Sequence, residues 1–292
     1  MAIIVDHDTK LVVQGATGRE GSFHTLRNRN YGTDVVAGVT PGKGGQDLEG
    51  IAIFDTVAEA VEETGANTSM VFVPARFAAD AIYEGVDAGI ATVICIAEGL
   101  PAHEMLRIYN YIQPRGITML GPNCPGALSP GKANVGIIPA EIFRGGRIGL
   151  VSRSGTLTYQ IGHELTQFGL GNSTIVGIGG DPVVGSSFVD VLAKFQDDDQ
   201  TEYVVLVGEI GGNEEEKAAA FIAEHVTKPV LAYIAGFSAP PGKTMGHAGA
   251  IISGSAGTAP AKKEALEAVG IAVGTTPTEV AQFVAERVGA HA

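Results

Sequence analysis

The sequence predicts an α/β protein built from two doubly wound domains. Short β-branched runs alternate with longer amphipathic helical patterns along the whole chain. Several strand candidates, such as the run from Tyr203 to Val207, are continuously apolar, which is typical of parallel strands covered on both faces. A length of 292 residues, 45% of them hydrophobic, is enough for two separate cores. Together these observations predict parallel sheets with right-handed crossovers and helices on both faces.

We expect strands at the short apolar runs, which are residues 11–14, 34–39, 51–54, 69–73, 91–96, 117–120, 147–151, 173–178, 203–208, 229–234 and 271–273. Amphipathic helices are expected between them, near residues 19–29, 57–64, 76–88, 101–112, 156–168, 186–196, 214–225, 260–269 and 277–288. The segment 121–131 is rich in Gly and Pro, and the alternation restarts after it. We therefore place the first domain at residues 1–122 and the second at 123–292.

Composition excludes several classes of function. A net charge of −13 with only 19 Lys and Arg residues argues against nucleic acid as a partner, because phosphate-backbone binding needs a basic face. Any anionic ligand must be held locally, by backbone N–H groups and a few placed cations. Two cysteines provide neither a disulfide framework nor metal-type spacing, so no metal site is expected. No stretch indicates export or membrane insertion, which leads us to expect a cytoplasmic protein.

A glycine-rich turn follows the first predicted strand. Gly15, Gly18 and Gly21 occupy a G-x-x-G-x-x-G spacing just before a helix, which lets the chain approach an anion and directs free N–H groups at it. The spacing is not that of the dinucleotide fingerprint, and the second strand leads into a loop with Lys43 rather than into an acidic residue. This favours a phosphate-bearing nucleotide other than a nicotinamide cofactor. The alternative is that the glycines serve only a tight turn.

Polar residues follow further strands at the same predicted sheet edge, where ligands of open α/β sheets bind. Glu98 and Asn123 are candidates for such a crevice. Glu98 is alternatively a first-turn acid that stabilises the next helix. Arg76 either contacts an anion or merely begins a helix.

A second anion cradle is expected after the strand at 147–151. Ser154 is the predicted N-cap of the next helix and Gly155 follows it, so the N–H groups at the start of that helix are available to a phosphate. A serine nucleophile is the alternative, but the sequence around Ser154 is not G-x-S-x-G.

A histidine between glycines completes the set of candidates. His247 follows a proline pair and precedes a run of small apolar residues, and Glu209 ends the strand at 203–208. A carboxylate at that edge can hydrogen-bond one imidazole nitrogen and leave the other as a nucleophile. We therefore predict that His247 pairs with Glu209, opposite the helix that starts near Ser154. The alternatives are a loop histidine and a solvent-facing acid.

Eight ordered motifs make the chain resemble the succinyl-CoA synthetase (succinate–CoA ligase) alpha subunit nearly from end to end. They are GATGREGSFHT at 15–25, VTPGKGG at 39–45, GPNCPG at 121–126, SRSGTLTY at 152–159, GIGGDPVVGSSF at 177–188, GEIGG at 208–212, EHVTKPVLAYIAG at 224–236 and GHAGAII at 246–252. The resemblance implies a Rossmann-like CoA-binding domain followed by a flavodoxin-like ligase domain. It also implies a beta subunit with an ATP-grasp domain, which would carry most of the nucleotide and Mg²⁺ site.

The resemblance also implies roles for individual residues. His247 would be the phosphorylated histidine, Glu209 the acid that orients it, and Tyr159 a contact to the acid substrate. Phosphate would displace CoA from succinyl-CoA, and the phosphoryl group of the resulting succinyl phosphate would pass through His247 to a nucleoside diphosphate. The contacts to CoA would come from residues after three predicted strands, namely Thr17, Gly18, Arg19, Glu20, Lys43, Ile96, Ala97 and Glu98.

Three positions depart from the pattern common in that family, namely Arg76, Gln160 and Ala256. Rival interpretations are an ATP-citrate lyase-like segment, a malate–CoA ligase, an ADP-forming acyl-CoA synthetase and a CoA-binding module without chemistry.

Overall fold

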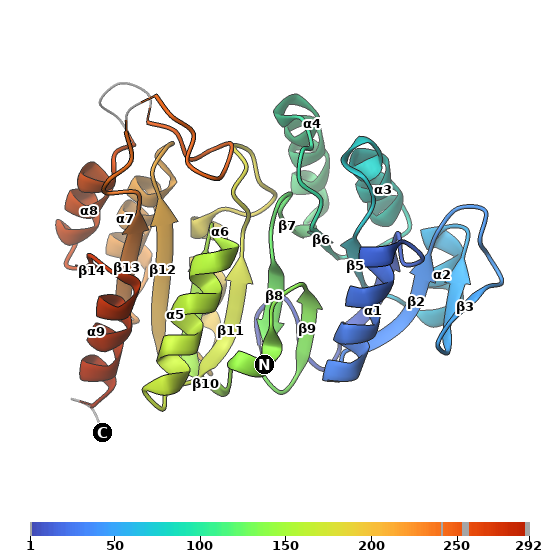
Figure 1. Ribbon diagram of the computed structural model, residues 1–292, viewed down its shortest axis with the longest axis horizontal. Coiled ribbons are helices and arrows are strands. Elements are labelled where there is room, and N and C mark those ends of the chain that lie inside the picture. Colours follow the sequence, from blue (N-terminus) through green and yellow to red (C-terminus); the bar gives the residue numbers. More distant parts are fainter. Residues whose placement is uncertain (1, 241, 253–256, 290–292) are drawn as a thin grey trace. The chain divides into compact units, whose positions relative to one another are not determined.

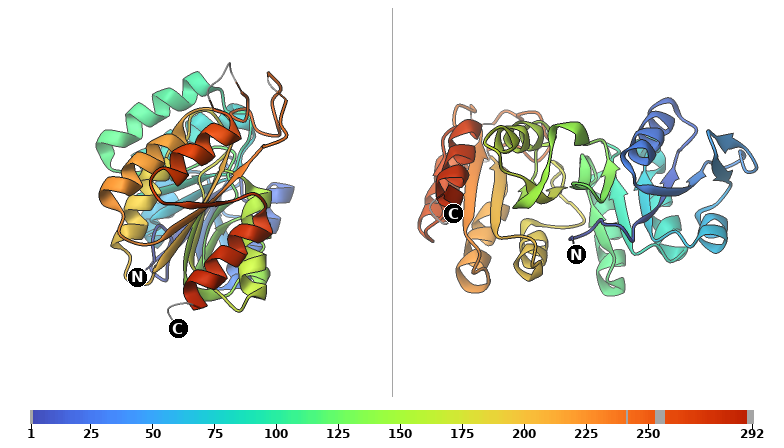
Figure 2. Two further views of the ribbon diagram at one scale, coloured as in Figure 1. Left: turned by 90° about the vertical axis from the view of Figure 1, so that its left-hand side faces the viewer. Right: turned by 90° about the horizontal axis from the view of Figure 1, so that it is seen from below.

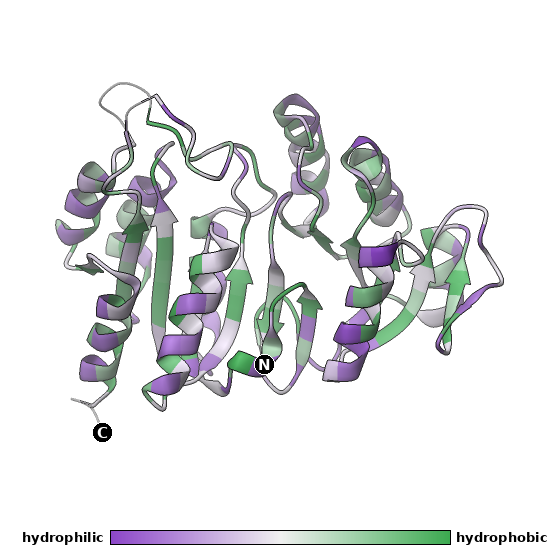
Figure 3. Ribbon diagram, viewed as in Figure 1, coloured by the Kyte–Doolittle hydropathy of each residue, from purple (hydrophilic) through white to green (hydrophobic). Residues whose placement is uncertain are grey.

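The computed structural model describes residues 2–240, 242–252 and 257–289, so Ala256 lies outside the described residues. The chain forms two compact units (Figure 1). The N-terminal unit consists of Ile4–Ile138 with Val183–Gly185, and the C-terminal unit consists mainly of Pro139–Pro182 and the chain from Ser186 onward. Short apolar strands supply the core of each unit, whereas polar residues lie on the outer faces of the helices (Figure 3).

The N-terminal unit contains a sheet in the order β3-β4-β2-β1-β5-β6-β7. All neighbouring pairs are parallel except β3 with β4. Without β3, the parallel strands follow the order 3-2-1-4-5-6 of Rossmann folds. The strands are β1 (Lys10–Gln14), β2 (Asp34–Val39), β3 (Asp47–Leu48), β4 (Ile51–Phe54), β5 (Thr68–Val71), β6 (Thr92–Cys95) and β7 (Thr118–Leu120).

Helix α1 (Arg19–Tyr31) covers one face of this sheet (Figure 2). The other face is covered by α2 (Val57–Thr64), α3 (Ala75–Asp87) and α4 (Ala102–Ile112), the last followed by the short 3₁₀ turn η1 (Gln113–Arg115). Helix α2 begins where predicted because Thr56 and Glu59 form a capping box, and it ends at Gly65 in the left-handed conformation.

The C-terminal unit contains parallel strands in the order β14-β13-β12-β10-β11. Counted along the chain from β10, this is the order 2-1-3-4-5 of flavodoxin-like folds. Helices α5 and α9 pack on each other, and α7 packs on both α6 and α8 (Figure 2). The elements are η2 (Ala140–Ile142), β10 (Gly145–Ser152), α5 (Gly155–Gln167), β11 (Asn172–Gly177), α6 (Phe188–Asp197), β12 (Tyr203–Glu209), α7 (Glu214–His225), β13 (Val230–Ala235), α8 (Ala259–Glu267), β14 (Ala272–Gly274) and α9 (Pro277–Gly289).

The predicted α/β class is confirmed, with two additions that the sequence pattern missed. One is β3, a strand of two residues, and the other is the antiparallel hairpin of β8 (Gly126–Ser129) and β9 (Ala133–Gly136). The hairpin belongs to the N-terminal unit because Asn28 donates to the carbonyl of Gly136 at 3.0 Å and Thr33 donates to that of Asn134 at 2.8 Å. By packing, this unit extends to Ile138, while the functional boundary after residue 122 stays a prediction.

Among the described residues, the structure contains no helix with the length and apolar character needed to span a membrane.

The half-buried imidazole of His24 predicts a pH-dependent stability. Its ring stacks on Phe72 with centroids 5.3 Å apart, and its buried Nδ1 has no hydrogen-bond partner among the described residues. Burial lowers the pKa of His24. The unfolded chain therefore takes up this proton at a higher pH than the folded chain, and stability falls as the pH decreases through about 6.5.

We expect His24→Phe to reduce the drop in melting temperature between pH 7.5 and pH 5.5. The exposed His103, changed to Phe, is the matched control and should leave the drop unchanged. An equal drop in the unaltered chain and the His24 variant would contradict this explanation.

Candidate active site

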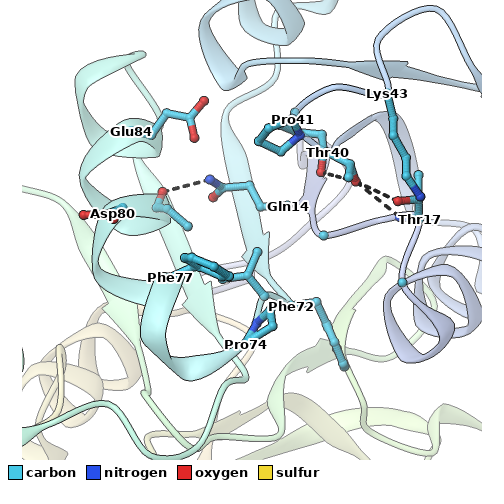
Figure 4. A pocket seen from close by; sticks show the side chains of 15 residues that line it. Gln14, Thr17, Thr40, Pro41, Lys43, Phe72, Pro74, Phe77, Asp80 and Glu84 are labelled. Atoms are coloured by element: carbon cyan, nitrogen blue, oxygen red, sulfur yellow. Dashed lines mark hydrogen bonds between the residues drawn. The ribbon is translucent and has the colours of Figure 1, made fainter.

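The N-terminal unit has a cavity of about 590 Å³ at the carboxyl ends of β1, β2 and β5 (Figure 4). This is where the strand order reverses, since β2 and β5 lie on opposite sides of β1. The cavity is lined by Gln14, Gly15, Thr17, Gly18, Val39, Thr40, Pro41, Lys43, Phe72, Val73, Pro74, Phe77, Asp80, Ala81 and Glu84.

The glycine turn beside this cavity needs its glycines for steric reasons. Gly15 has a φ of +86°, and a Cβ there would lie 2.7 Å from the carbonyl oxygen of Phe72. A Cβ on Gly21 would collide with the carbonyl oxygen of Gly15. Gly18 is the N-cap of α1 and has no side chain, so the N–H groups of the first helical turn are not capped by one. The turn thus combines close backbone approach with the positive end of a helix.

Three of the predicted CoA contacts, Thr17, Gly18 and Lys43, line this one cavity. The hydroxyl of Thr17 donates to Thr40 Oγ1 at 3.1 Å, and Thr40 in turn donates to the carbonyl of Val39 at 2.8 Å. These bonds join the turn after β1 to the loop after β2. Lys43 is exposed in that loop, so its ammonium group is accessible to an anion.

The other predicted contacts do not line the cavity. Arg19 and Glu20 are exposed and approach each other at 3.7 Å. Ile96, Ala97 and Glu98 follow β6. Asn123, with a φ of 55°, donates its backbone N–H to the carbonyl of Ala97 at 3.0 Å, so the turns after β6 and β7 are joined.

Arg76 is exposed, and its Cζ lies 4.7 Å from the centre of the Phe77 ring. Sequence reasoning missed Phe72, which directly follows β5, and Phe77, which lies in the first turn of α3. The available signal was a pair of aromatic residues close to the end of a strand.

In the C-terminal unit, Glu209 contacts both a histidine and an arginine. It ends β12, is 5% exposed, and its Oε2 lies 2.7 Å from His247 Nδ1. Its Oε1 lies 3.4 Å from Nε of Arg153, which directly follows β10. Strands β10 and β12 are neighbours at the point where the order of this sheet reverses. The structure therefore brings the two predicted residues together at the expected sheet edge.

The connection between β13 and α8 carries His247, and backbone contacts hold the ring. A Cβ on Gly180 would collide with the imidazole, so the ring packs directly on glycine backbone. The carbonyl of His247 accepts from the N–H of Ala250 at 3.0 Å, and the N–H of Gly249 donates to Gly180 at 3.2 Å. The imidazole thereby has a defined orientation toward Glu209.

Glu209 also shifts the protonation equilibrium of the imidazole toward the charged form. Its hydrogen bond to Nδ1 raises the pKa of His247 above the ordinary value, and burial opposes this effect. A carboxylate that accepts from Nδ1–H leaves Nε2 as the nitrogen with a free lone pair. The pair therefore suits nucleophilic chemistry at Nε2.

Sequence reasoning assigned no role to Arg153, although it lies within a motif that was singled out. Its side chain is buried, and Nη2 donates to the carbonyl of Asp181 at 2.9 Å. A buried guanidinium beside Glu209 offsets the negative charge of that carboxylate. The available signal was its position directly after a strand, comparable to that of Glu209 on the adjacent strand.

Ser154 is the N-cap of α5, as predicted, because its hydroxyl accepts the N–H of Leu157 at 3.3 Å. Its own N–H donates to the hydroxyl of Ser152 at 3.0 Å. The side chain thus serves the helix terminus, which weakens the nucleophile alternative. Gly155 begins the helix, and the half-buried Tyr159 follows one turn later.

The described residues contain no group of three or more His, Cys, Asp or Glu side chains that could hold a metal ion.

Each unit has a candidate site at the carboxyl edge of its sheet, and the family models assign the chain to a class that combines CoA binding with CoA-ligase chemistry. Residues 6–99 match the CoA binding domain family, and residues 151–272 match the CoA-ligase family. A succinate–CoA ligase [ADP-forming] subunit alpha 2 from Archaeoglobus fulgidus is 60% identical over 98% of this chain and 99% of the relative. The corresponding alpha subunit from Aquifex aeolicus is 58% identical over 98% and 94%. The chain belongs to the family of succinate–CoA ligase alpha subunits.

A solved structure supports the fold alone. The ATP citrate lyase from Methanothrix soehngenii, in complex with citrate and coenzyme A, superposes with a TM-score of 0.89 at 23% identity. The match covers 99% of this chain but only 51% of that lyase chain, so this chain spans about half of its length.

Proposed function

We propose that this chain is the alpha subunit of a succinate–CoA ligase of the tricarboxylic acid cycle. The enzyme interconverts succinyl-CoA, a nucleoside diphosphate and phosphate with succinate, CoA and a nucleoside triphosphate. The observation that carries the proposal is the 2.7 Å contact between His247 and Glu209 in a chain that also contains a CoA-binding domain. A module that only binds CoA has no need of a second domain with such a pair.

CoA is expected in the crevice of the N-terminal unit. The turn at Gly15–Gly18, the uncapped N-terminus of α1 and Lys43 offer N–H groups and one cation to its phosphates. The joined turns after β6 and β7, with Ile96, Ala97, Glu98 and Asn123, are proposed to continue the CoA site. Arg19 and Glu20 complete the proposed contacts.

His247 is proposed to carry the phosphoryl group between two reactions. Its Nε2 lone pair attacks the phosphorus of succinyl phosphate, the bond from phosphorus to the acyl oxygen breaks, and succinate leaves as the carboxylate. Because Nδ1 keeps its proton, the phosphorylated ring becomes an imidazolium, which Glu209 stabilises through the hydrogen bond to Nδ1. Attack by a nucleoside diphosphate on the same phosphorus then restores the neutral ring.

Positive charge near His247 is needed because a phosphoryl group adds nearly two negative charges. Arg153 supplies a buried cation. The N-terminus of α5, with Ser154 and Gly155, supplies about half a unit of positive charge. Tyr159 is proposed to contact the acid substrate from this helix.

The alpha subunit designation of the relatives implies a second subunit. We propose that this beta subunit contains the ATP-grasp domain and most of the nucleotide and Mg²⁺ site. A cytoplasmic location, expected from the sequence, is part of the same proposal.

Co-expression with the beta subunit tests the function. The purified complex should release CoA from succinyl-CoA in a reaction that depends on phosphate and a nucleoside diphosphate. In the reverse direction, succinate, malate and acetate should be compared as acids. Succinate should give the highest kcat/KM, and a preference for malate or acetate would favour one of the rival ligases.

The contact between Lys43 and CoA leads to a separate prediction. Lys43→Ala should weaken CoA binding by about 10- to 150-fold, since a charge-assisted hydrogen bond contributes about 1.5–3 kcal/mol. Calorimetric titration with CoA at two salt concentrations measures this change. Lys10 on β1 is outside the cavity lining, so Lys10→Ala is the control. Unchanged affinity in the Lys43 variant would remove this residue from the proposed site.

A further inference from the structure

A buried ion pair lies behind Glu209 in the C-terminal unit. Lys262 of α8 contacts Glu215 of α7, and neither side chain has any exposed surface. Glu216 Oε2 is the next acidic atom, at 3.6 Å from Lys262 Nζ. Removing two charges from water is costly, and apolar residues of similar volume often replace such a pair without loss of stability. Net stability is therefore a weak explanation for these two charges.

The two oxygens of Glu215 have different partners. Oε2 pairs with Lys262, while Oε1 accepts the backbone N–H of Glu209 at 3.0 Å. Gly208 leaves room for this contact, because a Cβ at that position would lie only 2.6 Å from Glu215 Oε1. Glu215 thus binds the backbone of the residue whose carboxylate binds His247.

Lys262 lies on the element that follows His247 in the chain. It lies in the first turn of α8, the helix that follows the connection carrying His247, and Thr258 caps that helix by accepting the N–H of Ala261 at 3.3 Å. Glu215 lies near the start of the helix that follows β12. The ion pair therefore joins the end of the connection with His247 to the strand that ends in Glu209.

We propose that Lys262 and Glu215 form a positioning pair that fixes the position of the Glu209 carboxylate relative to the His247 imidazole. This inference rests on the proposed phosphoryl transfer through His247. Lys262 keeps the Glu215 carboxylate in place, the carboxylate holds the N–H of Glu209, and the Glu209 side chain is thereby directed at Nδ1. Burial raises the pKa of Glu215 and the charge of Lys262 opposes this effect, so Lys262 also favours the ionised acceptor.

Two double variants separate positioning from folding. Lys262→Met with Glu215→Gln removes both charges but keeps an oxygen that can accept from the N–H of Glu209. Lys262→Met with Glu215→Met removes the charges and that acceptor while filling a similar volume. Lys263→Met with Glu267→Leu alters a more exposed pair on the same helix and is the matched control. Thermal unfolding of each complex shows whether the variants are folded.

The readout is the rate at which His247 is phosphorylated by labelled ATP in the complex with the beta subunit, measured across pH. The Glu215→Met double variant should be slowed by about 10- to 100-fold, because a misplacement of about 1 Å can cost 10². The acid limb of its pH profile should also move to lower pH, as Glu209 no longer raises the pKa of His247. The charged groups acting on this pKa are Glu209, Arg153 and Asp181. The control should resemble the unaltered complex. The Glu215→Gln double variant should lie between the control and the Glu215→Met double variant, because it keeps an acceptor for the N–H of Glu209 but lacks the cation that holds this acceptor in place.

Equal rates and equal pH profiles in the two double variants would overturn the inference, as would rates that follow melting temperature alone. If the Glu215→Met variant does not fold, Lys262→Arg, which retains a cation, joins the Glu215→Gln double variant in the test. Lys262→Arg should keep the original rate and pH profile, whereas the Glu215→Gln double variant, which lacks the cation, should be slower. Equal rates in these two variants would overturn the inference. If the unaltered complex forms no phosphohistidine, the proposed function fails instead.

Discussion

Replacing His247 by Ala is expected to abolish overall turnover and formation of the phosphoprotein. The hydrogen bond from His247 Nδ1 to Glu209 Oε2 leaves Nε2 of the same ring as a nucleophile. Among the described residues of the site, no other nitrogen with a nucleophilic lone pair is hydrogen-bonded to Glu209 Oε2. CoA binding should be unchanged, because the proposed CoA crevice lies in the N-terminal unit, which has its own core. Radiolabelled ATP with the beta subunit measures phosphorylation, and calorimetric titration measures CoA affinity.

His225→Ala is the matched control for this experiment. His225 is an exposed histidine at the end of α7, and its replacement should leave both turnover and labelling intact. An acid-labile phosphoprotein formed by the His247 variant would show that another residue carries the phosphoryl group.

Replacing Glu209 by Gln should slow phosphorylation by about 10² to 10⁴, the usual contribution of acid–base assistance. The amide carries no negative charge to orient Nδ1–H or to stabilise the imidazolium that forms on phosphorylation. The unaltered enzyme should lose rate as the pH falls through the raised pKa of His247, because protonation removes the Nε2 lone pair. Without the carboxylate this pKa falls, so the acid limb of the variant should lie at lower pH.

Stability must be measured beside the rate for this variant. Glu209 and Arg153 are both buried, so removal of the carboxylate leaves the guanidinium unpaired, at a cost of about 3–5 kcal/mol. Assays at a temperature well below the melting temperature of the variant separate the two effects. Glu224→Gln, at an exposed position on α7, is the control. An unchanged rate and pH profile in the Glu209 variant would make Glu209 a structural residue only.

Sequence patterns predicted the regular elements well because each element has a strong local signal. The helices α2 and α7 begin and end at the predicted residues, 57–64 and 214–225. Strand β12 was recognised from a run of apolar residues that the structure buries completely between Val204 and Val207. The hairpin β8–β9 was missed because its short strands lie among Gly and Pro residues, where the pattern indicates turns.

The site was predicted less completely because its decisive contacts are between residues far apart in the chain. The pairing of Glu209 with His247 could be predicted, since a carboxylate at a strand end and a histidine between glycines are visible in the sequence. Lys262 could not, because in the segment APAKKEALE it has the appearance of a solvated helix lysine, and only the fold shows it to be fully buried. Arg153 likewise acquires its role only when β10 and β12 become neighbours.

The position of the phosphoryl group tests the central claim most directly. The complex with the beta subunit is phosphorylated with ATP, the peptide that contains His247 is isolated, and ³¹P NMR of the complex identifies the phosphorylated nitrogen. Because Glu209 occupies Nδ1, the phosphoryl group should be found on Nε2 of His247. A phosphoryl group on Nδ1, or on Ser154, would contradict the account.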